Sequence, residues 1–561
     1  MIGTERRALR FDLLREPWIP VVTLKGEPET VGLREALDRA HEFRWIQGET
    51  PTVTAALHRL LVTLTLRVYF DGSAGWGTQW SELWHRGPFP TERLDRYLNG
   101  EGDSTGYRDR FDLFGDRPFF QTPDIPEELL GSTAKLTMFR AAGNNATLFD
   151  HSTQEDQVEL SPAEAARWLV TVQAFDTGGL KTGKLPSQPS LGNGAATVVI
   201  EGATLRETLL LNTTPNWADD TLDPRPGPGD QPVWERDPAV SQGSKEADKR
   251  GRAPSGLLDL LTWPSRHVRL RGRFGANGVV VDGVAILPGP RLSTDLRSVE
   301  NMAAYRRTFT RKKNVPGKGV SSPWKPVQLE ELRGVWRHCR ELLLADEDND
   351  SQRERFRPRN LDHVAARHQG KDALPESTVY TIRVLGQQLD PNRGAVHTWL
   401  EEAVPAPAAV LRAQPRETRL EPLMGLAVSL ADDVGDELGK LEREYHALLR
   451  DAPRAERKLL QQWFWPRLSE HFNDYLVDLG ERIRENDVGA FEPTENWANV
   501  VEETAEEAQH RWVELVPRRS ARNLLALAEC TSGYQERVRG IRHEFDRNLK
   551  SYDPRPRTED E

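Results

Sequence analysis

Apolar residues recur every three to four positions along the last third of the chain. The first stripe covers 423–448, and three more follow at 459–479, 497–515 and 524–549. This spacing places apolar side chains on one face of a helix, and Gly480 should end the second helix because glycine favours the position after the last helical residue. Four such helices joined by short loops pack antiparallel. We therefore expect an antiparallel four-helix bundle with a polar tail at 405–561.

The chain before residue 405 shows shorter and less regular patterns. A mostly apolar run at 52–69 predicts a helix buried in the core. Ser161–Glu164 is a capping box with Pro162 at the first helical position, which predicts a helix that ends near Phe175. Residues 222–255 are rich in Pro, Gly and charge, and we expect them to form a mobile internal loop.

Charge and composition limit the function classes. The 561 residues carry a formal net charge of -11 with an isoelectric point near 5.8, so phosphate contacts must come from local basic patches. No apolar run suits a membrane span or a signal peptide, and we expect a cytoplasmic protein without membrane contact. Cys339 and Cys530 are far apart and lack neighbouring Cys or His residues, so we expect no disulfide framework and no Cys-rich zinc site. The 13 histidines include no His-Glu-x-x-His motif, and we expect no metal and no cofactor.

One segment imitates a phosphate-binding loop. Gly178–Lys184 matches the first seven positions of the P-loop motif, but Leu185 occupies the place of the Ser or Thr that holds magnesium. Pro186 and Pro189 prevent the helix whose N-terminus should face the phosphates. A nucleotide-dependent enzyme that uses residues 178–184 is therefore kept only as an alternative, and we expect no catalytic residues.

Four other segments are candidate contact regions. Asp176–Gly194 contains five glycines, which let a backbone approach a ligand closely. The region between Asn301 and Gln328 has seven basic residues and no acidic one, and we interpret it as a basic loop. Thr378–Leu385 and Ala395–Leu400 predict a β-hairpin around turn-forming residues. Arg266–Arg273 should be a strand with arginines on one face, facing nucleic acid or a carboxylate partner. Each segment is equally compatible with an ordinary protein surface.

Two aromatic and proline-containing strings carry a family resemblance. Phe11–Pro20 and Phe111–Gln121 resemble the two opening signatures of the CasA family, the large subunit of the type I-E CRISPR surveillance complex Cascade. The likeness extends over nearly the whole chain. It implies an α+β protein with a large, irregular, mixed α/β N-terminal domain, at 1–404 in this chain, followed by the four-helix bundle. It also implies that the protein has no catalytic activity.

The resemblance also implies a set of contact residues. It suggests a glycine loop with Thr177, Gly178, Gly179 and Lys181, and a lysine finger with Arg311, Lys312 and Lys313. It suggests a wedge hairpin with Gln387, Gln388, Asn392, Arg393 and Gly394, and a mobile loop to the guide handle or motif with Phe149, Asp150 and His151. Gln387 and Gln388 lie on the ascending strand, whereas Asn392 and Arg393 lie near the tip. The sequence leaves open which of them enters the base stack.

By this resemblance the protein recognises a protospacer-adjacent motif (PAM) in double-stranded DNA from the minor groove and wedges the duplex open to start an R-loop. The minor groove distinguishes mainly A·T from G·C, so we expect a relaxed choice of PAM. The implied partners are the crRNA-containing Cascade subunits (backbone, small and crRNA-end), the target DNA and the type I helicase-nuclease. A purely structural assembly subunit is the other alternative to this function.

Overall fold

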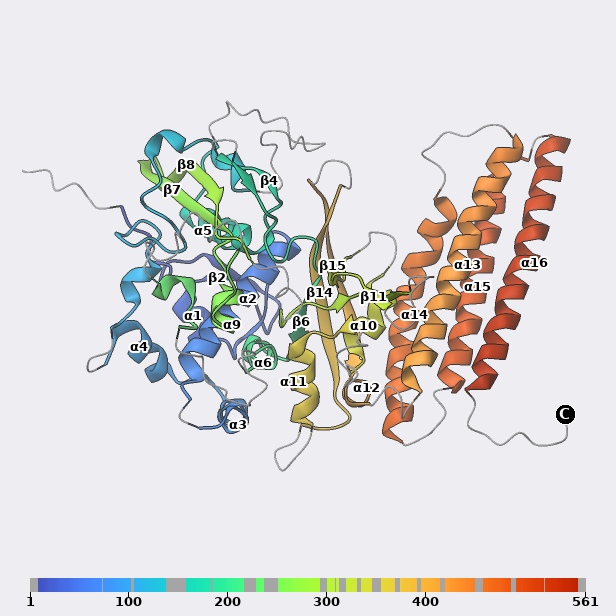
Figure 1. Ribbon diagram of the computed structural model, residues 1–561, viewed down its shortest axis with the longest axis horizontal. Coiled ribbons are helices and arrows are strands. Elements are labelled where there is room, and N and C mark those ends of the chain that lie inside the picture. Colours follow the sequence, from blue (N-terminus) through green and yellow to red (C-terminus); the bar gives the residue numbers. More distant parts are fainter. Residues whose placement is uncertain are drawn as a thin grey trace, which may run out of the picture. The chain divides into compact units, whose positions relative to one another are not determined.

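The computed structural model describes most of the chain, in two compact units (Figure 1). The described residues are 9–72, 74–101, 105–137, 158–182, 185–215, 229–236, 251–292, 300–307, 309–311, 319–329, 334–345, 355–368, 374–390, 395–413, 419–449, 458–485, 491–518 and 520–552. The first unit comprises residues 1–328, 358–363 and 383–401, and the second comprises 329–357, 364–382 and 402–561.

The first unit mixes short helices with small antiparallel sheets. Its described helices include α1 (Leu33–Asp38), α2 (Pro51–Tyr69), α3 (Trp76–Arg86), α4 (Thr91–Asn99), α5 (Pro162–Phe175), α6 (Leu205–Leu211) and α9 (Leu257–Leu261). Its strands include β1 (Ile19–Thr23), β2 (Pro28–Val31), β3 (Phe43–Ile46), β6 (Thr197–Glu201), β7 (Arg266–Gly275) and β8 (Gly278–Pro288). Strands β2, β1 and β3 form one sheet in that order, and β7 and β8 form a separate antiparallel ribbon. The mixed α/β character agrees with the fold class expected from the sequence.

The core of the first unit is built around α2, as the apolar run predicts. Thr50 accepts a hydrogen bond from the Val53 amide at 3.3 Å and so caps the helix, which is buried over nearly its whole length. Arg59 lies inside this core and donates to both carboxylate oxygens of Glu300, at 2.7 and 2.9 Å. A buried charge is tolerated when it is paired in this way.

Part of the segment expected to form a mobile loop is packed. Residues 229–236 include a 3-10 helix, η5 (Val233–Glu235), and the side chain of Trp234 is only 4% exposed. Trp234 donates a hydrogen bond to the Tyr97 hydroxyl at 2.8 Å. A single large aromatic residue anchors a segment that is otherwise poor in apolar residues, which composition alone does not indicate. Residues 216–228 and 237–250 lie outside the described part.

The second unit contains the four long helices. They are α13 (Leu420–Leu449), α14 (Leu459–Arg484), α15 (Phe491–Leu515) and α16 (Ala521–Ser551), and they lie side by side (Figure 1). The prediction that Gly480 ends the second helix is wrong. Helix α14 continues to Arg484, and Gly480 lies inside it at a close approach, because a Cβ there would stand 2.4 Å from the Cβ of Pro407.

Residues before 402 contribute to the core of the bundle unit. Trp336, in the 3-10 helix η7 (Val335–His338), stacks on Phe472 with the ring centroids 4.7 Å apart. The same indole contacts Trp497 at 5.6 Å. The boundary placed at 404 therefore leaves out residues 329–357 and 364–382, which belong to the unit that holds the bundle. Among the described helices, none combines the length and apolar composition that a bilayer span requires.

Candidate nucleic-acid interface

A short hairpin rich in glycine follows helix α5. The helix begins where Ser161 accepts a hydrogen bond from the Glu164 amide at 3.1 Å, as the capping box predicts. The chain then turns through Gly179, whose φ of +113° is unfavourable for other residues. Strands β4 (Gly179–Leu180) and β5 (Pro186–Ser187) pair antiparallel. We call residues 176–190 the glycine hairpin.

Asp176 holds the two sides of the glycine hairpin together. Its Oδ2 accepts from the Arg266 guanidinium at 2.5 Å and from the Lys181 ammonium at 2.6 Å. Arg266 also donates to the carbonyl oxygens of Thr177 at 3.2 Å and Gln188 at 2.8 Å. Arg266 is 2% exposed, so these contacts are shielded from water. The hairpin is thereby fixed to the first residue of β7.

Lys181 is engaged within the protein in this conformation. Its side chain is 14% exposed and forms the ion pair with Asp176. Burial lowers the pKa of Lys181, and the nearby Asp176 carboxylate opposes part of that effect. Among the other expected contact residues, Thr177 is buried and Gly179 is exposed. The exposed backbone of the hairpin is therefore the part best placed to approach a ligand.

The hairpin predicted from 378–400 is present and is anchored at the end of α5. It consists of β14 (Val379–Leu389) and β15 (Val396–Pro407). Gln387 is 4% exposed, and its amide nitrogen donates to the Phe175 carbonyl at 2.9 Å and to the Asn193 side chain at 2.8 Å. Its neighbour Gln388 is half-buried. We call β14 and β15 the wedge hairpin; its tip residues Asn392, Arg393 and Gly394 lie outside the described residues.

The basic segment expected to be a loop contains a small antiparallel hairpin. Strand β10 (Phe309–Arg311) pairs with β11 (Gly319–Ser321), and the pair of Arg311 with Gly319 is the last before residues 312–318. Lys312 and Lys313 fall within that stretch, outside the described part of the chain. Beside these strands, the Arg307 guanidinium lies 4.3 Å from the centroid of the Trp324 ring. We call residues 309–321 the lysine hairpin.

The turn at 190–196 connects these features. Gly192 donates from its amide to the Ala174 carbonyl at 2.8 Å, and a Cβ at Gly192 would stand 2.7 Å from the Phe175 ring. The Ala196 amide donates to the Val327 carbonyl at 2.9 Å, just beyond the lysine hairpin. The glycine hairpin, the turn at 190–196 and Gln387 of the wedge hairpin therefore meet at the end of α5, whereas Val327, six positions beyond the lysine hairpin, bonds to the turn. The expected mobile-loop residues Phe149, Asp150 and His151 lie outside the described residues.

The described residues of the P-loop-like segment do not follow the strand–loop–helix path of a P-loop. Pro186 lies in strand β5, where a P-loop would continue as a helix, and the Thr182 hydroxyl accepts a hydrogen bond from the Ile286 amide at 3.1 Å. In the described residues, no group of three His, Cys, Asp or Glu side chains is arranged to hold a metal ion. The arrangement is suited to contact and positioning.

A family model supplies the decisive comparison. The model for CRISPR-associated protein Cse1 matches residues 12–508. The chain belongs to the Cse1 family. A curated Cse1-family relative, the CasA/Cse1 protein of Thermus thermophilus, is 32% identical over 447 residues, which cover 78% of each chain.

Solved structures of the Cse1 family share this fold. Thermobifida fusca Cse1 has a TM-score of 0.74 at 25% identity, covering 96% of this chain and 98% of that one. Thermus thermophilus CasA has a TM-score of 0.70 at 27% identity, covering 94% and 99%. A chain in a solved CRISPR RNA-guided surveillance complex gives 0.67 at 20% identity, covering 94% and 99%, which shows a common fold.

Sequence reasoning named Asp176, Arg266 and Gln387 but missed the long-range contacts through which they position the interface. Asp176 and Arg266 lie 90 positions apart, and Gln387 lies 212 positions from Phe175. No local pattern marks such pairs. The arginine face of β7 is predicted to meet a partner, but Arg271 and Arg273 both pair with Asp282, at 2.8 and 2.9 Å. A carboxylate of the same chain therefore satisfies them.

Proposed function

We propose that this Cse1-family protein is a non-catalytic subunit of a crRNA-guided type I-E Cascade complex. In that complex it recognises the PAM in double-stranded DNA from the minor groove. It then opens the adjacent base pairs to start R-loop formation and helps to recruit the helicase-nuclease. Its other partners are the backbone, small and crRNA-end subunits, with residues 149–151 contacting the guide handle or the PAM.

The observation that carries this proposal is that the glycine hairpin and the wedge hairpin meet at the end of α5, and that the segment after the lysine hairpin bonds to the adjoining turn. A reader of the minor groove needs backbone that can approach the base edges, and the exposed Gly179 in strand β4 of the glycine hairpin provides it. The lysine hairpin supplies positive charge for phosphates. The wedge hairpin is held beside them through Gln387, so reading and opening would occur at one place.

The energetics favour such an arrangement. Exchange of a DNA duplex for an RNA–DNA hybrid is nearly balanced per base pair, so protein contacts must tip the opening of the first pairs. Unstacking one base step costs a few kcal/mol. A wedge fixed to the same helix end as the PAM reader can apply binding energy at that step.

The test is duplex binding by the reconstituted complex, with and without this chain, across a library of flanking trinucleotides at fixed salt. Lys312→Ala and Lys313→Ala should weaken binding, and each should lower the salt slope by about one unit if that lysine binds one phosphate. Lys550→Ala, which removes an exposed charge from α16, is the matched control. A purely structural subunit predicts that all three variants bind alike.

Removing the side chains at the wedge tip distinguishes PAM recognition from duplex opening. Replacing Asn392 and Arg393 by glycine should preserve PAM binding but reduce duplex opening, measured by the fluorescence of 2-aminopurine beside the PAM. Unchanged opening would argue against the wedge. The nucleotide-dependent alternative instead predicts magnesium-dependent hydrolysis that disappears in Lys184→Ala, and we expect no hydrolysis from the parent protein.

A further inference from the structure

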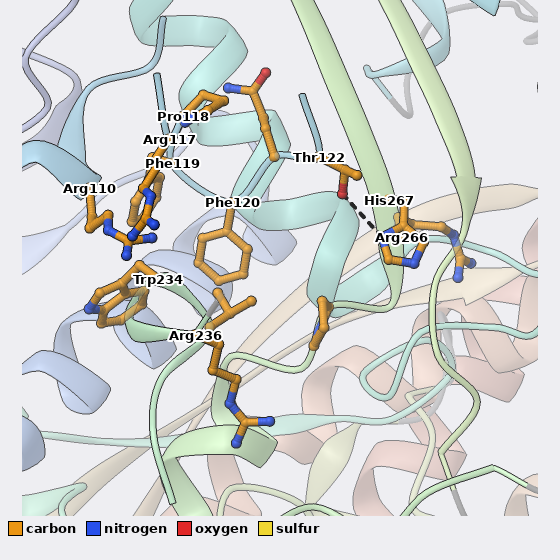
Figure 2. A pocket seen from close by; sticks show the side chains of 13 residues that line it. Arg110, Arg117, Pro118, Phe119, Phe120, Thr122, Trp234, Arg236, Arg266 and His267 are labelled. Carbon is orange, nitrogen blue, oxygen red and sulfur yellow. Dashed lines mark hydrogen bonds between the residues drawn. The ribbon is translucent and has the colours of Figure 1, made fainter. Parts of the chain in front are cut away.

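A small recess lies beside the Phe111–Gln121 string, in the first unit. It has a volume of about 50 Å³ and is lined by residues 117–122, by η5 and by the start of β7 (Figure 2). One wall carries Arg110, from the 3-10 helix η1 (Arg108–Phe111). Among the described residues, Arg266 of β7 alone both lines this recess and bonds to one of the three hairpins, the glycine hairpin. The recess is therefore a second candidate site.

The lining is rich in basic residues. Among the described residues it includes Arg110, Arg117, Arg236, Arg266 and His267 and no carboxylate, with Arg236 and Arg266 paired to Asp259 and Asp176. Arg110 is half-buried and Arg117 is exposed. Within the described residues, neither of these two guanidinium groups has a hydrogen bond or ion pair. Both are therefore available to a ligand without breaking an existing contact.

The carboxylates behind the recess do not neutralise it. Asp259 accepts from Arg236 at 3.1 Å and from Arg252 at 2.6 Å, so one negative charge serves two positive ones. Asp176 is shared between two cations in the same way. The nearby Asp230 accepts from two backbone amides at the start of α9, at 3.2 and 2.9 Å. Positive charge remains in excess at the mouth of the recess, which favours an anion.

Part of the lining is an aromatic cluster that contains a strained residue. Phe120 has a φ of +55°, which is a costly conformation for a bulky residue. Its ring lies 5.0 Å from that of Phe119 and 6.0 Å from that of Trp234. The side chain of Gln121 bridges two neighbouring main-chain segments at 2.8 and 2.9 Å. The fold thus maintains a strained residue at this point, as ligand sites commonly do.

We propose that this recess is a phosphate-binding site, and that its ligand is a backbone phosphate of an RNA or DNA strand. A cavity needs roughly 10–15 Å³ for each water molecule, so a volume of about 50 Å³ suits a group of the size of a phosphate. Arginine binds phosphate oxygens through its fork of N–H donors. The site would grip a strand at a place separate from the PAM-reading hairpins, and the proposal holds whether or not those hairpins read the PAM.

The experiment uses the full-length chain and three variants. Arg110→Gln and Arg117→Gln each remove one free guanidinium, whereas Arg86→Gln removes an exposed arginine of α3 outside the recess. Thermal unfolding is followed in sodium phosphate and in sodium chloride of equal ionic strength. Binding of a labelled 12-nucleotide RNA and of a 20-base-pair DNA duplex is then measured by fluorescence anisotropy between 50 and 200 mM salt. Over about this salt range the affinity of a site with several phosphate contacts changes strongly.

Phosphate should raise the melting temperature of the parent and of Arg86→Gln, and this rise should be smaller in both recess variants. Each recess variant should bind at least one of the two probes, the RNA or the DNA duplex, roughly tenfold more weakly than the parent. The slope of log affinity against log salt should fall by about one unit for that probe. Loss confined to RNA assigns the site to the guide strand, and loss confined to the duplex assigns it to the target. The proposal would be overturned if all four proteins showed the same phosphate-dependent rise in melting temperature and the same affinities for the RNA and for the DNA duplex. Both outcomes are independent of PAM choice, because the recess is separate from the hairpins proposed to read the PAM.

Discussion

A single carboxylate, that of Asp176, holds both sides of the glycine hairpin through Arg266 and Lys181. Removing one member of a buried ion pair leaves the others charged and poorly solvated, which costs far more than breaking a pair on the surface. Arg266 is the more deeply buried of the two cations. The hairpin should therefore be sensitive to neutral replacements at position 176.

Asp176→Asn should lower the free energy of unfolding by about 3 kcal/mol and speed hydrogen exchange of the amides in the glycine hairpin. The matched control is Glu159→Gln, which breaks the exposed pair with Arg273 and should cost about 1 kcal/mol or less. Chemical denaturation and hydrogen exchange measured by mass spectrometry provide the two readouts. Equal losses in the two variants would show that Asp176 does not organise the hairpin.

His58 gives the core of the first unit a pH dependence. His58 is a buried residue of α2, and its ring packs against that of Trp45, with 4.1 Å between the ring centroids. Burial lowers the pKa of His58 to about 4. An unfolded histidine has a pKa near 6.5, so the unfolded chain binds more protons between these values. Stability from this group is present above about pH 6.5 and is lost as the pH falls toward 4.

We expect His58→Gln to flatten the fall in melting temperature between about pH 6.5 and pH 4.5, relative to the parent protein. His85→Gln, which changes an exposed histidine of α3, should leave the fall unchanged. Scanning fluorimetry across this range is sufficient. A parallel slope in His58→Gln would mean that another group causes the loss.

Among the elements, the wedge hairpin depends on one side chain for its attachment to α5. Gln387 donates two hydrogen bonds through its amide nitrogen, and Gln388 is half-buried; in the described structure neither side-chain Oε1 has a hydrogen-bond partner. Neighbouring glutamines on one strand point to opposite faces. They should therefore have separate roles, with Gln387 positioning the hairpin.

Gln387→Ala should accelerate hydrogen exchange in residues 383–389 by roughly tenfold, because it leaves the Phe175 carbonyl without a partner. Gln388→Ala should change this rate much less. Mass spectrometry of the intact chain gives the comparison directly. Equal exchange rates in the two variants would show that the Gln387 hydrogen bonds do not position the wedge hairpin.

The bundle helices contain two glycines with opposite surroundings. A Cβ at Gly435 would stand 2.3 Å from the Trp465 ring, whereas one at Gly540 would meet nothing within 4 Å. Gly435→Ala should destabilise the protein by about 1–3 kcal/mol. Gly540→Ala should stabilise it by roughly 0.5–1 kcal/mol, because alanine favours the helix. Denaturant titration of both variants tests the packing of α13 on α14, and equal effects would contradict it.

Local signals predict individual elements better than their assembly. The capping box at Ser161 locates α5, and the apolar stripes locate the four long helices. The stripes are less accurate at helix ends: they place Leu448 and Leu515 in the core, but these residues are 41% and 64% exposed. The place of Trp336 in the bundle unit depends on a contact with Phe472, far away in sequence. Such long-range contacts decide the core and the candidate interface, and periodicity does not encode them.

For the molecule as a whole, net charge sets the conditions for binding. The formal charge of -11 opposes association with DNA, while the basic groups form small local patches. A few phosphate contacts from such patches supply only part of the attraction that a duplex needs. Full affinity should therefore require the additional contacts of the assembled complex.

We expect the isolated chain to bind a PAM-containing duplex at least roughly tenfold more weakly than the reconstituted complex at about 150 mM salt. The gap should widen as salt is lowered, because the complex makes more phosphate contacts and so has the steeper salt dependence. Fluorescence anisotropy at three salt concentrations measures it. Equal affinities at every concentration would place the whole binding energy in this subunit.

Arg266 has a consequence that reaches beyond its own contacts. It lines the cationic recess, and its guanidinium donates to Asp176 and to the carbonyls of Ser265, Thr177 and Gln188. An anion that draws on this guanidinium changes the free energy of the loop it fastens. Thermodynamic reciprocity then requires that a ligand on the loop change the anion's affinity by the same factor. Binding at the recess would therefore change the affinity of the glycine hairpin for its ligand, and no domain movement would be required.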